Sequence, residues 1–424
     1  MHHAKISLGI YDMKKIVMLS CLLSPFSFAS QTLFNPIVSS TSTSSSVSNP
    51  ASDYLTAQQN VSGLVLIEPL ALGYELGQVD SLIDELDELE DILENGASSV
   101  AEANAAEAKF DSFLANAGEE GYVKAIASGS VIVFPSLYQN ARAGVFTLNF
   151  NYGGMAKLGV LDDPDGVTAS GSSLTTESSV YEQVIKVSTF GLGYRETLWS
   201  DGVSSFSVGT KFNLTQLYSS RKLSTIEYQG DDEDEGEYTS TNIGIDVGVL
   251  WKINALSLGL TATNLNEPTY NLGELGYDCS NGRSSTGEEN CDASVFFDSI
   301  GDIDLNGEYV AERQVTADFV LSSAENALNI QGSYDLNSVT DATGDEYQWA
   351  EIAFSYLSDS FFIPGLRVGY KQNLVGNELS YVNAGYTFFK YINIDSGMSL
   401  DTVSYEGATY PRSLYINLGL AAVF

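Results

Sequence analysis

Few side chains in this sequence could carry out acid–base or nucleophilic chemistry. Histidine occurs only as His2 and His3, ahead of a segment that we expect to be removed on export. The mature chain then lacks the general base of a Ser-His-Asp or Cys-His hydrolase and the nitrogen ligand of a histidine-bound zinc site. We predict that the protein is not an enzyme and that it holds no organic cofactor.

One loop has the ligand spacing of a calcium site. Asp302, Asp304 and Asn306 stand at alternate positions and are followed by Gly307, as in loops that wrap the ion in oxygen ligands around a turning glycine. The twelfth position is Arg313 rather than the bidentate glutamate of such loops. Two interpretations stay open, a calcium site and a turn that leads into a strand.

Two cysteines of the mature chain predict a disulfide. Cys279 and Cys291 flank a stretch rich in Gly, Ser, Asn and Glu. In an exported chain, a disulfide that closes this one loop is the simplest interpretation. Redox or metal chemistry would require closer spacing or more ligands.

Residues 13–29 predict export. Two lysines follow Met13, then comes an uncharged and mostly apolar run, and Ala29 offers a small residue for cleavage. We therefore expect residues 1–29 to comprise an upstream extension and a signal peptide.

The charge balance excludes one class of partner. Lys plus Arg number 19 against 55 Asp plus Glu, giving a net charge of −36 that repels nucleic-acid phosphates. We therefore expect no nucleic-acid partner. Only 17% of the residues are charged and 44% are hydrophobic, with 24 Tyr, 20 Phe and 38 Gly. That composition is typical of a large β architecture and not of a disordered chain.

The hydrophobic pattern predicts strands that cross a membrane. No segment after residue 29 contains the roughly 18 consecutive apolar residues that a membrane-spanning helix needs. In residues 414–424, by contrast, Leu, Ile, Leu, Leu, Ala and Phe alternate with Tyr, Asn, Gly, Ala and Val. This is the two-residue period of a strand with one apolar face, and a final Phe resembles the recognition signal of bacterial outer-membrane barrels. An edge strand of a soluble sandwich is the alternative interpretation.

The same alternation recurs along the chain and predicts an even number of strands, fourteen, as bacterial barrels require. We place them at 61–70, 122–136, 144–160, 183–199, 204–217, 240–252, 255–265, 309–322, 327–336, 346–356, 364–373, 379–388, 391–400 and 412–424. The predicted fold class is therefore all-β, a transmembrane antiparallel β-barrel over residues 61–424. Short and long connections alternate, so we expect short turns in the periplasm and long loops outside.

Two segments depart from the strand pattern. Leucines at helical spacing and then an Ala-rich stretch predict a helical hairpin insertion at 77–117, either a solvated surface hairpin or one that binds a ligand or partner. Residues 30–60 are rich in Ser, Thr, Asn and Ala, with too little apolar content for a strand. We expect them to form either a plug-like segment in the lumen or a disordered tail.

Alternation also directs charged side chains into the barrel. These charged side chains either form ion pairs with one another inside the barrel or line an ion-selective path. They are Lys211, Asp246, Lys252, Asp318, Glu351, Arg367 and Lys371.

Several stretches resemble a known family. They are Gly-Ser-Tyr-Asp-Leu-Asn at 332–337, Gly-Asp-Glu-Tyr-Gln-Trp at 344–349, Pro-Gly-Leu-Arg-Val-Gly-Tyr-Lys at 364–371, Val-Asn-Ala-Gly-Tyr-Thr-Phe at 382–388 and Gly-Val-Leu-Trp-Lys at 248–252. These stretches look like the TraF-like family of exported proteins. That family is associated with plasmid conjugal transfer and is similar in build to the FadL-type fatty-acid channels of the outer membrane. Asn49-Pro50-Ala51 also resembles the Asn-Pro-Ala element of the FadL-type plug.

The resemblance implies a bacterial outer-membrane barrel that binds or passes hydrophobic small molecules through a plugged lumen. The alternative is a conjugal-transfer component of the cell envelope or surface that acts through protein contacts rather than transport. In both cases the expected surroundings are outer-membrane lipid and lipopolysaccharide. The acidic run at 230–236 is either a solvated surface or a site where divalent cations bridge to lipopolysaccharide.

Overall fold

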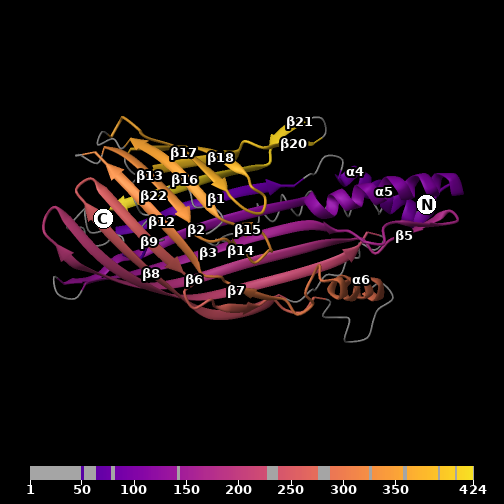
Figure 1. Cartoon of the computed structure of the whole chain (residues 1–424), viewed down its shortest axis with the longest axis horizontal. Coiled ribbons are helices and arrows are strands. Elements are labelled where there is room, and N and C mark those ends of the chain that lie inside the picture. The colour runs from indigo at the N-terminus through magenta and orange to yellow at the C-terminus, as the bar shows by residue number, and fades with distance from the viewer. Residues whose placement is uncertain are drawn as a thin grey trace.

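Fourteen antiparallel strands close into one barrel in the computed structural model of the chain (Figure 1). The structure describes residues 49–51, 64–77, 82–140, 144–226, 237–275, 287–323, 327–356, 361–389, 392–405 and 408–423. The first barrel strand pairs with the second on one side and with the last on the other, which closes the wall. In order around the wall, the strands are β1 Leu64–Leu76, β2 Tyr122–Asn140, β3 Gly144–Leu161, β6 Ser179–Ser200, β7 Ser204–Thr225, β8 Tyr238–Ile253, β9 Leu256–Thr263, β12 Gln314–Ser322, β13 Leu328–Asp335, β16 Trp349–Tyr356, β17 Gly365–Asn373, β18 Ser380–Phe388, β19 Ile392–Ser399 and β22 Ser413–Val423.

The prediction of an all-β, fourteen-stranded antiparallel barrel is confirmed. Toward the loop side, β6 and β7 extend beyond their predicted bounds, to Ser179 and Thr225, and are still paired with each other there. The extensions contain buried polar side chains such as Ser219 and Arg221. They lack the apolar outer face from which the sequence predicts a strand, so the prediction ends too early.

The two faces of the wall differ as the two-residue period of a strand requires. On β7, Phe212 is 49% exposed on the outside whereas its neighbour Lys211 is only 4% exposed inside the lumen. Large apolar side chains are exposed in the same way on most barrel strands, which is the surface expected of a barrel in lipid. They include Phe150, Phe190, Leu192, Leu214, Ile243, Val249, Leu258, Leu260, Phe319, Leu321, Ile330, Ile352, Phe354, Leu366, Val368, Val382, Ile394, Ile416 and Leu418.

The connections at the two ends of the barrel differ in length (Figure 1). Residues 201–203 and 254–255 are short connections at one end, which we call the turn end. The opposite end, the loop end, carries every helix and small hairpin that the structure describes. These are α4 Leu82–Asn95, α5 Val100–Glu120, α6 Gly287–Ile300, β4 Thr168–Ser170 with β5 Ser173–Thr175, β10 Thr269–Asn271 with β11 Glu308–Val310, β14 Val339–Thr340 with β15 Glu346–Tyr347, and β20 Thr402–Tyr405 with β21 Ala408–Pro411. Which end faces the outside of the cell stays a prediction.

Helices α4 and α5 occupy the chain between β1 and β2, where the sequence predicts a helical insertion. Leu89 of α4 and Phe110 and Leu114 of α5 are buried in one apolar cluster. Lys109 of α5 forms ion pairs with Glu85 at 2.6 Å and Glu88 at 2.7 Å on α4. Among the described residues, no helix has the length and apolar character needed to cross a membrane.

An apolar cluster fills the lumen toward the loop end, and we call it the lumen core. It combines wall residues from opposite sides of the barrel with residues of the β10–β11 and β14–β15 hairpins. Its buried members are Ile126, Met155, Ile185, Leu217, Tyr270, Leu272, Ala311, Ala342, Tyr347, Trp349, Leu379, Tyr381 and Tyr415. The interior of the barrel is therefore partly packed rather than an open channel.

Candidate functional site

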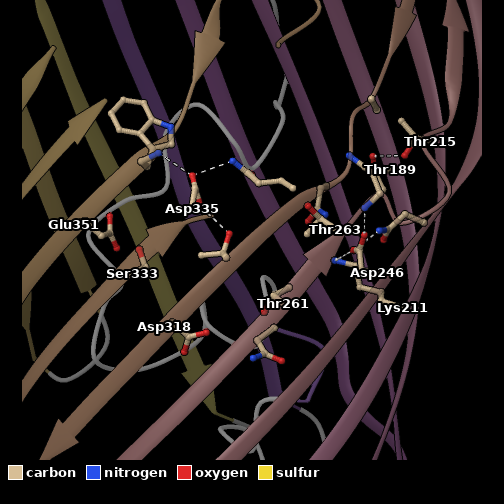
Figure 2. Close-up of a pocket in the computed structure, with 18 of the residues that line it drawn as sticks. Thr189, Lys211, Thr215, Asp246, Thr261, Thr263, Asp318, Ser333, Asp335 and Glu351 are labelled. Carbon is tan, nitrogen blue, oxygen red and sulfur yellow. Dashed lines mark hydrogen bonds and ion pairs between the residues drawn. The ribbon is translucent and has the colours of Figure 1, made fainter. Parts of the chain in front are cut away.

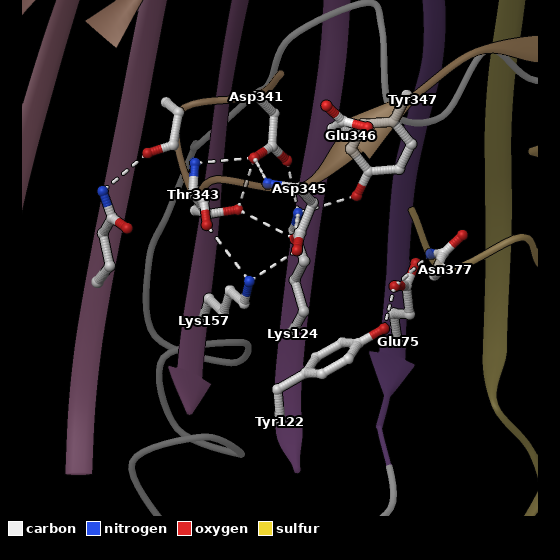
Figure 3. Close-up of polar contacts among 12 residues, drawn as sticks. Glu75, Tyr122, Lys124, Lys157, Asp341, Thr343, Asp345, Glu346, Tyr347 and Asn377 are labelled. Atoms are coloured by element: carbon white, nitrogen blue, oxygen red, sulfur yellow. Dashed lines mark hydrogen bonds and ion pairs between the residues drawn. The ribbon is translucent and has the colours of Figure 1, made fainter. Parts of the chain in front are cut away.

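One connection reaches across the barrel. Residues 336–348, which we call the crossing loop, join β13 to β16 and contain the β14–β15 hairpin. In the order of fourteen strands β13 is ninth and β2 is second, so the two strands are seven places apart in either direction. The crossing loop nevertheless contacts β2, which places it across the lumen (Figure 3).

Four charged side chains, two buried and two partly buried, hold the crossing loop to the far wall, and we call them the latch. Lys124 of β2 places its Nζ 2.6 Å from Asp341 Oδ2 and 2.6 Å from Asp345 Oδ2. Lys157 of β3 places its Nζ 2.7 Å from Asp345 Oδ1. Lys124 also donates to the hydroxyl of Tyr347 at 3.0 Å. Two lysines face two aspartates, so the latch is close to electrically neutral, which is the condition under which buried ions are tolerated.

Further hydrogen bonds support the latch. Gln183 of β6 donates its Nε2 to the carbonyl oxygen of Ala342 at 2.8 Å. Within the crossing loop, the backbone N–H of Thr343 and its hydroxyl both donate to Asp341 Oδ1 at 2.8 Å. The loop is therefore tied to three successive wall strands, β2, β3 and β6.

The latch changes the acidity of one of its members. Burial by itself raises the pKa of the Asp345 carboxyl, but the Lys124 and Lys157 ammonium groups outweigh it and hold that pKa below its ordinary value. The carboxylate form is therefore maintained at neutral pH, as the two ion pairs require.

A cavity of about 240 Å³ lies in the lumen beside the lumen core (Figure 2). Its apolar lining includes Leu217, Tyr270 and Trp349, which are also members of the lumen core. The rest of the lining is polar, and six of its side chains are charged. These are Asp246, Asp318, Asp335, Glu351, Lys211 and Lys371.

The charged lining residues differ in how fully they are paired. Asp335 accepts hydrogen bonds from Gln314 Nε2 at 2.9 Å, from the Thr316 hydroxyl at 2.7 Å and from the Trp349 backbone N–H at 2.9 Å. Lys371 lies with its Nζ 3.8 Å from the centre of the Trp349 ring, a cation–π contact.

On another part of the wall, Asp246 accepts from Asn213 Nδ2 at 2.6 Å and lies 3.7 Å from Lys211 Nζ. Three buried polar atoms of the lining have no hydrogen-bond partner within the described chain: Asn151 Oδ1, Asn213 Oδ1 and Trp349 Nε1. Such atoms are uncommon in folded proteins and call for a missing partner.

The tripeptide Asn49-Pro50-Ala51 lies inside the barrel against β7 and β8. Asn49 Nδ2 donates to the carbonyl oxygen of Val249 at 3.3 Å, and the Ala51 N–H donates to Asn49 Oδ1 at 2.9 Å. Gly209 and Gly248 face each other beneath it. A Cβ atom added to Gly209 would lie 2.1 Å from the Pro50 carbonyl oxygen, and one added to Gly248 would lie 2.2 Å from Asn49 Oδ1. The tripeptide can therefore approach the wall closely because the wall has glycines there. The rest of the predicted plug-like segment 30–60 lies outside the described residues.

The structure brings most of the predicted lumen charges together. Lys211, Asp246, Asp318, Glu351 and Lys371 line the cavity. Arg367 is buried elsewhere in the lumen and pairs with Asp395 at 2.8 Å, while Lys252 is exposed near the turn end.

The sequence interpretation missed the latch and Asp335. Lys124 follows the strand alternation of β2, so its lumen position could have been predicted. Its partners Asp341 and Asp345 could not, because nothing in a loop sequence indicates that the loop crosses the barrel.

Three sequence predictions stay untested: the calcium site, the disulfide and the signal peptide. Asp304 accepts the Asn306 N–H at 2.9 Å on its carboxylate and an Arg221 donor at 2.7 Å on its backbone carbonyl. Among the described residues no group of three or more His, Cys, Asp or Glu is arranged to hold a metal ion, so calcium binding by Asp302, Asp304 and Asn306 stays a prediction. The same holds for the disulfide of Cys279 and Cys291, because Cys279 lies outside the described residues, as does the predicted signal peptide.

Comparison with known protein families identifies the chain. The family described as "F plasmid transfer operon, TraF, protein" matches residues 46–335. The chain belongs to this TraF family. The match covers the tripeptide in the lumen, helices α4 to α6 and the barrel strands through β13. No curated protein matches this TraF-family chain.

Three solved structures are similar to the TraF-family chain at a low level. A Pseudomonas aeruginosa FadL homologue is 11% identical. The match covers 89% of this chain and 93% of the homologue, with a TM-score of 0.38. The transport unit of the autotransporter AIDA-I from Escherichia coli is 10% identical. The match covers 87% of this chain and 92% of the transport unit, with a TM-score of 0.34. CdiB from Acinetobacter baumannii is 9% identical. The match covers 86% of this chain and 61% of CdiB, with a TM-score of 0.32.

Proposed function

We propose that this TraF-family barrel is an outer-membrane channel that binds or passes hydrophobic small molecules in its lumen, in the manner of a FadL-type protein. The observation that carries the proposal is the cavity beside the lumen core, inside a closed barrel whose loop end is crossed by the latched loop. The lining combines aromatic and aliphatic side chains with many polar ones, so the cavity offers contacts for both an apolar and a polar part of a small molecule.

The outer surface supports a location in the outer membrane. Strands of this kind span a membrane only as a closed barrel, since an open edge leaves backbone groups without hydrogen bonds in lipid. The exposed Phe, Leu, Ile and Val side chains of the outer face then contact lipid, with lipopolysaccharide as the partner beyond it. The high negative net charge disfavours nucleic acid as a partner.

Uptake into liposomes tests the transport proposal. The purified barrel is reconstituted, and entry of a long-chain fatty acid is compared with entry of a small sugar and with empty liposomes. Entry of the fatty acid alone supports a FadL-like channel. Entry of both indicates a general pore, and entry of neither, in a barrel shown to be folded, contradicts transport.

A second function follows from family membership. The family description names a plasmid transfer operon, so we propose as the alternative an envelope component that assists conjugal transfer through protein contacts. Helices α4 and α5 pack beyond the barrel wall at the loop end and offer the surface for such contacts (Figure 1). Replacing residues 78–120 by a short turn would abolish transfer between cells while leaving liposome entry unchanged if contact is the function.

A further inference from the structure

Three buried asparagines gather on one part of the lumen wall. Asn149 of β3 is opposite Gly191 of β6, and Gly191 is opposite Asn213 of β7, so the three residues form one transverse row. A Cβ atom added to Gly191 would lie 2.2 Å from Asn149 Oδ1 and 3.0 Å from Asn213 Oδ1. The glycine therefore lets the two amide groups approach each other across β6. Asn151 is two residues further along β3, on the same face of that strand.

Each of these asparagines has an amide atom without a hydrogen-bond partner within the described chain. The atoms are Asn151 Oδ1, Asn213 Oδ1 and Asn149 Nδ2, and the side chains are 7%, 8% and 6% exposed, respectively. Asn151 and Asn213 line the cavity. The orientation of the Asn213 amide is fixed because its Nδ2 donates to Asp246 at 2.6 Å. Two neighbouring acceptors of the cavity lining therefore call for N–H or O–H donors.

This part of the lining carries no net charge. Lys211 and Asp246 form the next row toward the turn end, with Lys211 Nζ 3.7 Å from Asp246 Oδ2. On the other side of the Asn213 row, Thr189 and Thr215 are opposite each other and share a hydrogen bond of 3.0 Å (Figure 2). The remaining charges of the lining stand on β12, β13, β16 and β17, on another part of the wall. An ionised head group would therefore lose hydration here without a net attraction in return.

An apolar surface adjoins these groups on the loop-end side. Val187 of β6 is opposite Leu217 of β7, one two-residue step along from the Thr189–Thr215 row. Such a step is about 7 Å. Both apolar side chains line the cavity, and Leu217 belongs to the lumen core. Hydrogen-bonding groups and an apolar surface are therefore within reach of one small molecule.

We propose that the cavity binds an amphipathic molecule whose head group is uncharged and carries hydroxyls, as in an alkyl glycoside. Its hydroxyls donate to Asn151 Oδ1 and Asn213 Oδ1, and its apolar part packs on Val187 and Leu217. A fatty acid is disfavoured at this site because its carboxylate is charged and offers acceptors but no donor. This inference rests on the proposed small-molecule function and names the class of its ligand.

Trp349 reports binding because it lines the cavity. The chain has three tryptophans, and Trp199 and Trp251 are about half exposed on the outer face. In a W199F/W251F background, the full-length protein is purified from membranes and placed in nanodiscs. Its fluorescence is then titrated at pH 7.5 with hexyl glucoside, hexanol, hexylamine and hexanoate, which share one tail length and differ in the head. Each titration is plotted against the free aqueous concentration, so that partition into lipid does not count as binding.

We expect hexyl glucoside to bind about ten-fold more tightly than the other three compounds. N151L and N213L should each weaken glucoside binding by about five-fold, the effect of one lost hydrogen bond. N417L is the matched control, because Asn417 of β22 is a fully buried asparagine with unpaired amide atoms but is outside the cavity lining. It should bind the glucoside as the unaltered pocket does.

Several outcomes would overturn the choice of head group and leave the small-molecule function standing. They are equal affinity for glucoside and hexanol, tighter binding of hexylamine or hexanoate, glucoside binding that is unchanged in both N151L and N213L, and an equal loss in N417L. The comparison of the four head groups uses the unaltered pocket and decides the matter even if a variant fails to fold. Binding of none of the compounds by a folded barrel would contradict both the inference and the proposed function.

Discussion

Lys124 and Asp341 are 217 residues apart in the sequence and are joined by a buried ion pair of 2.6 Å between Nζ and Oδ2. Lys124 is on the barrel wall, and Asp341 arrives from the diametrically opposite wall on the crossing loop. Because the Lys124 side chain is fully buried, the pair acts with little screening by solvent. We therefore expect this pair to contribute strongly to holding the loop across the lumen.

Replacing Lys124 by methionine should release the crossing loop. K124M leaves the buried Asp341 without a lysine and Asp345 with Lys157 alone. Removal of one partner of a buried pair costs about 3–5 kcal/mol. We expect faster hydrogen exchange in residues 339–347 and a larger conductance in planar bilayers, with the barrel still folded. K109M removes an exposed ion-pair partner on α5, where the cost is about 0–1 kcal/mol, and should change neither measurement. Normal exchange in K124M would show that the lumen core alone holds the loop.

The ion pairs of the latch should also break in acid, but only in strongly acidic solution. The pKa of Asp345 is depressed in the folded state, so its contribution to stability is complete above the ordinary aspartate pKa of about 3.9. The contribution is lost as the pH falls through the lower, folded-state pKa. Conductance should therefore be the same at pH 7 and pH 5 and rise only below about pH 4. A transition near pH 6 in the unaltered protein, absent in D345N, would contradict this assignment.

The barrel could be predicted from the sequence because each strand carries its own signal. In β7 the alternation of Phe212 and Leu214 with Lys211 and Asn213 is local, and fourteen such segments define the wall. The crossing loop has no comparable signal. Its position depends on ion pairs between residues hundreds of positions apart, which no periodicity encodes.

The cavity is an intermediate case. Strand alternation correctly directs Lys211, Asp246, Asp318, Glu351 and Lys371 inward, and the register then gathers them in one place. Register depends on the exact turn lengths and on irregularities such as the shift in β1 between Glu68 and Ala71. Which lumen residues meet was therefore not available from the sequence alone.

The glycine pair beneath the tripeptide gives a further prediction. In G209A the new methyl group meets the Pro50 carbonyl oxygen, which belongs to the backbone and cannot rotate away. Overpacking of this kind costs about 1–3 kcal/mol, so the tripeptide should leave the wall. A cysteine introduced by A51C should then react faster with a thiol reagent. G159A, where the nearest atom to the new methyl is 4.0 Å away, is the control, and equal labelling in both variants would refute the contact.

The ion pair of Arg367 and Asp395 gives the last prediction, and it separates charge from packing. Gly385 stands between them on β18, opposite each in the register, and its lack of a side chain lets Arg367 Nε reach Asp395 Oδ1 at 2.8 Å. R367M leaves the buried Asp395 carboxylate without its ion-pair partner and should lower the free energy of unfolding in urea by about 3–5 kcal/mol. The double variant R367M/D395L removes both charges and should recover most of that loss, since apolar replacement of a buried pair is often neutral. K186M, which breaks an exposed pair with Glu237, should cost no more than about 1 kcal/mol. A double variant as unstable as R367M would mean that the lumen at this point is hydrated and that the side chains stabilise the wall through packing rather than through charge.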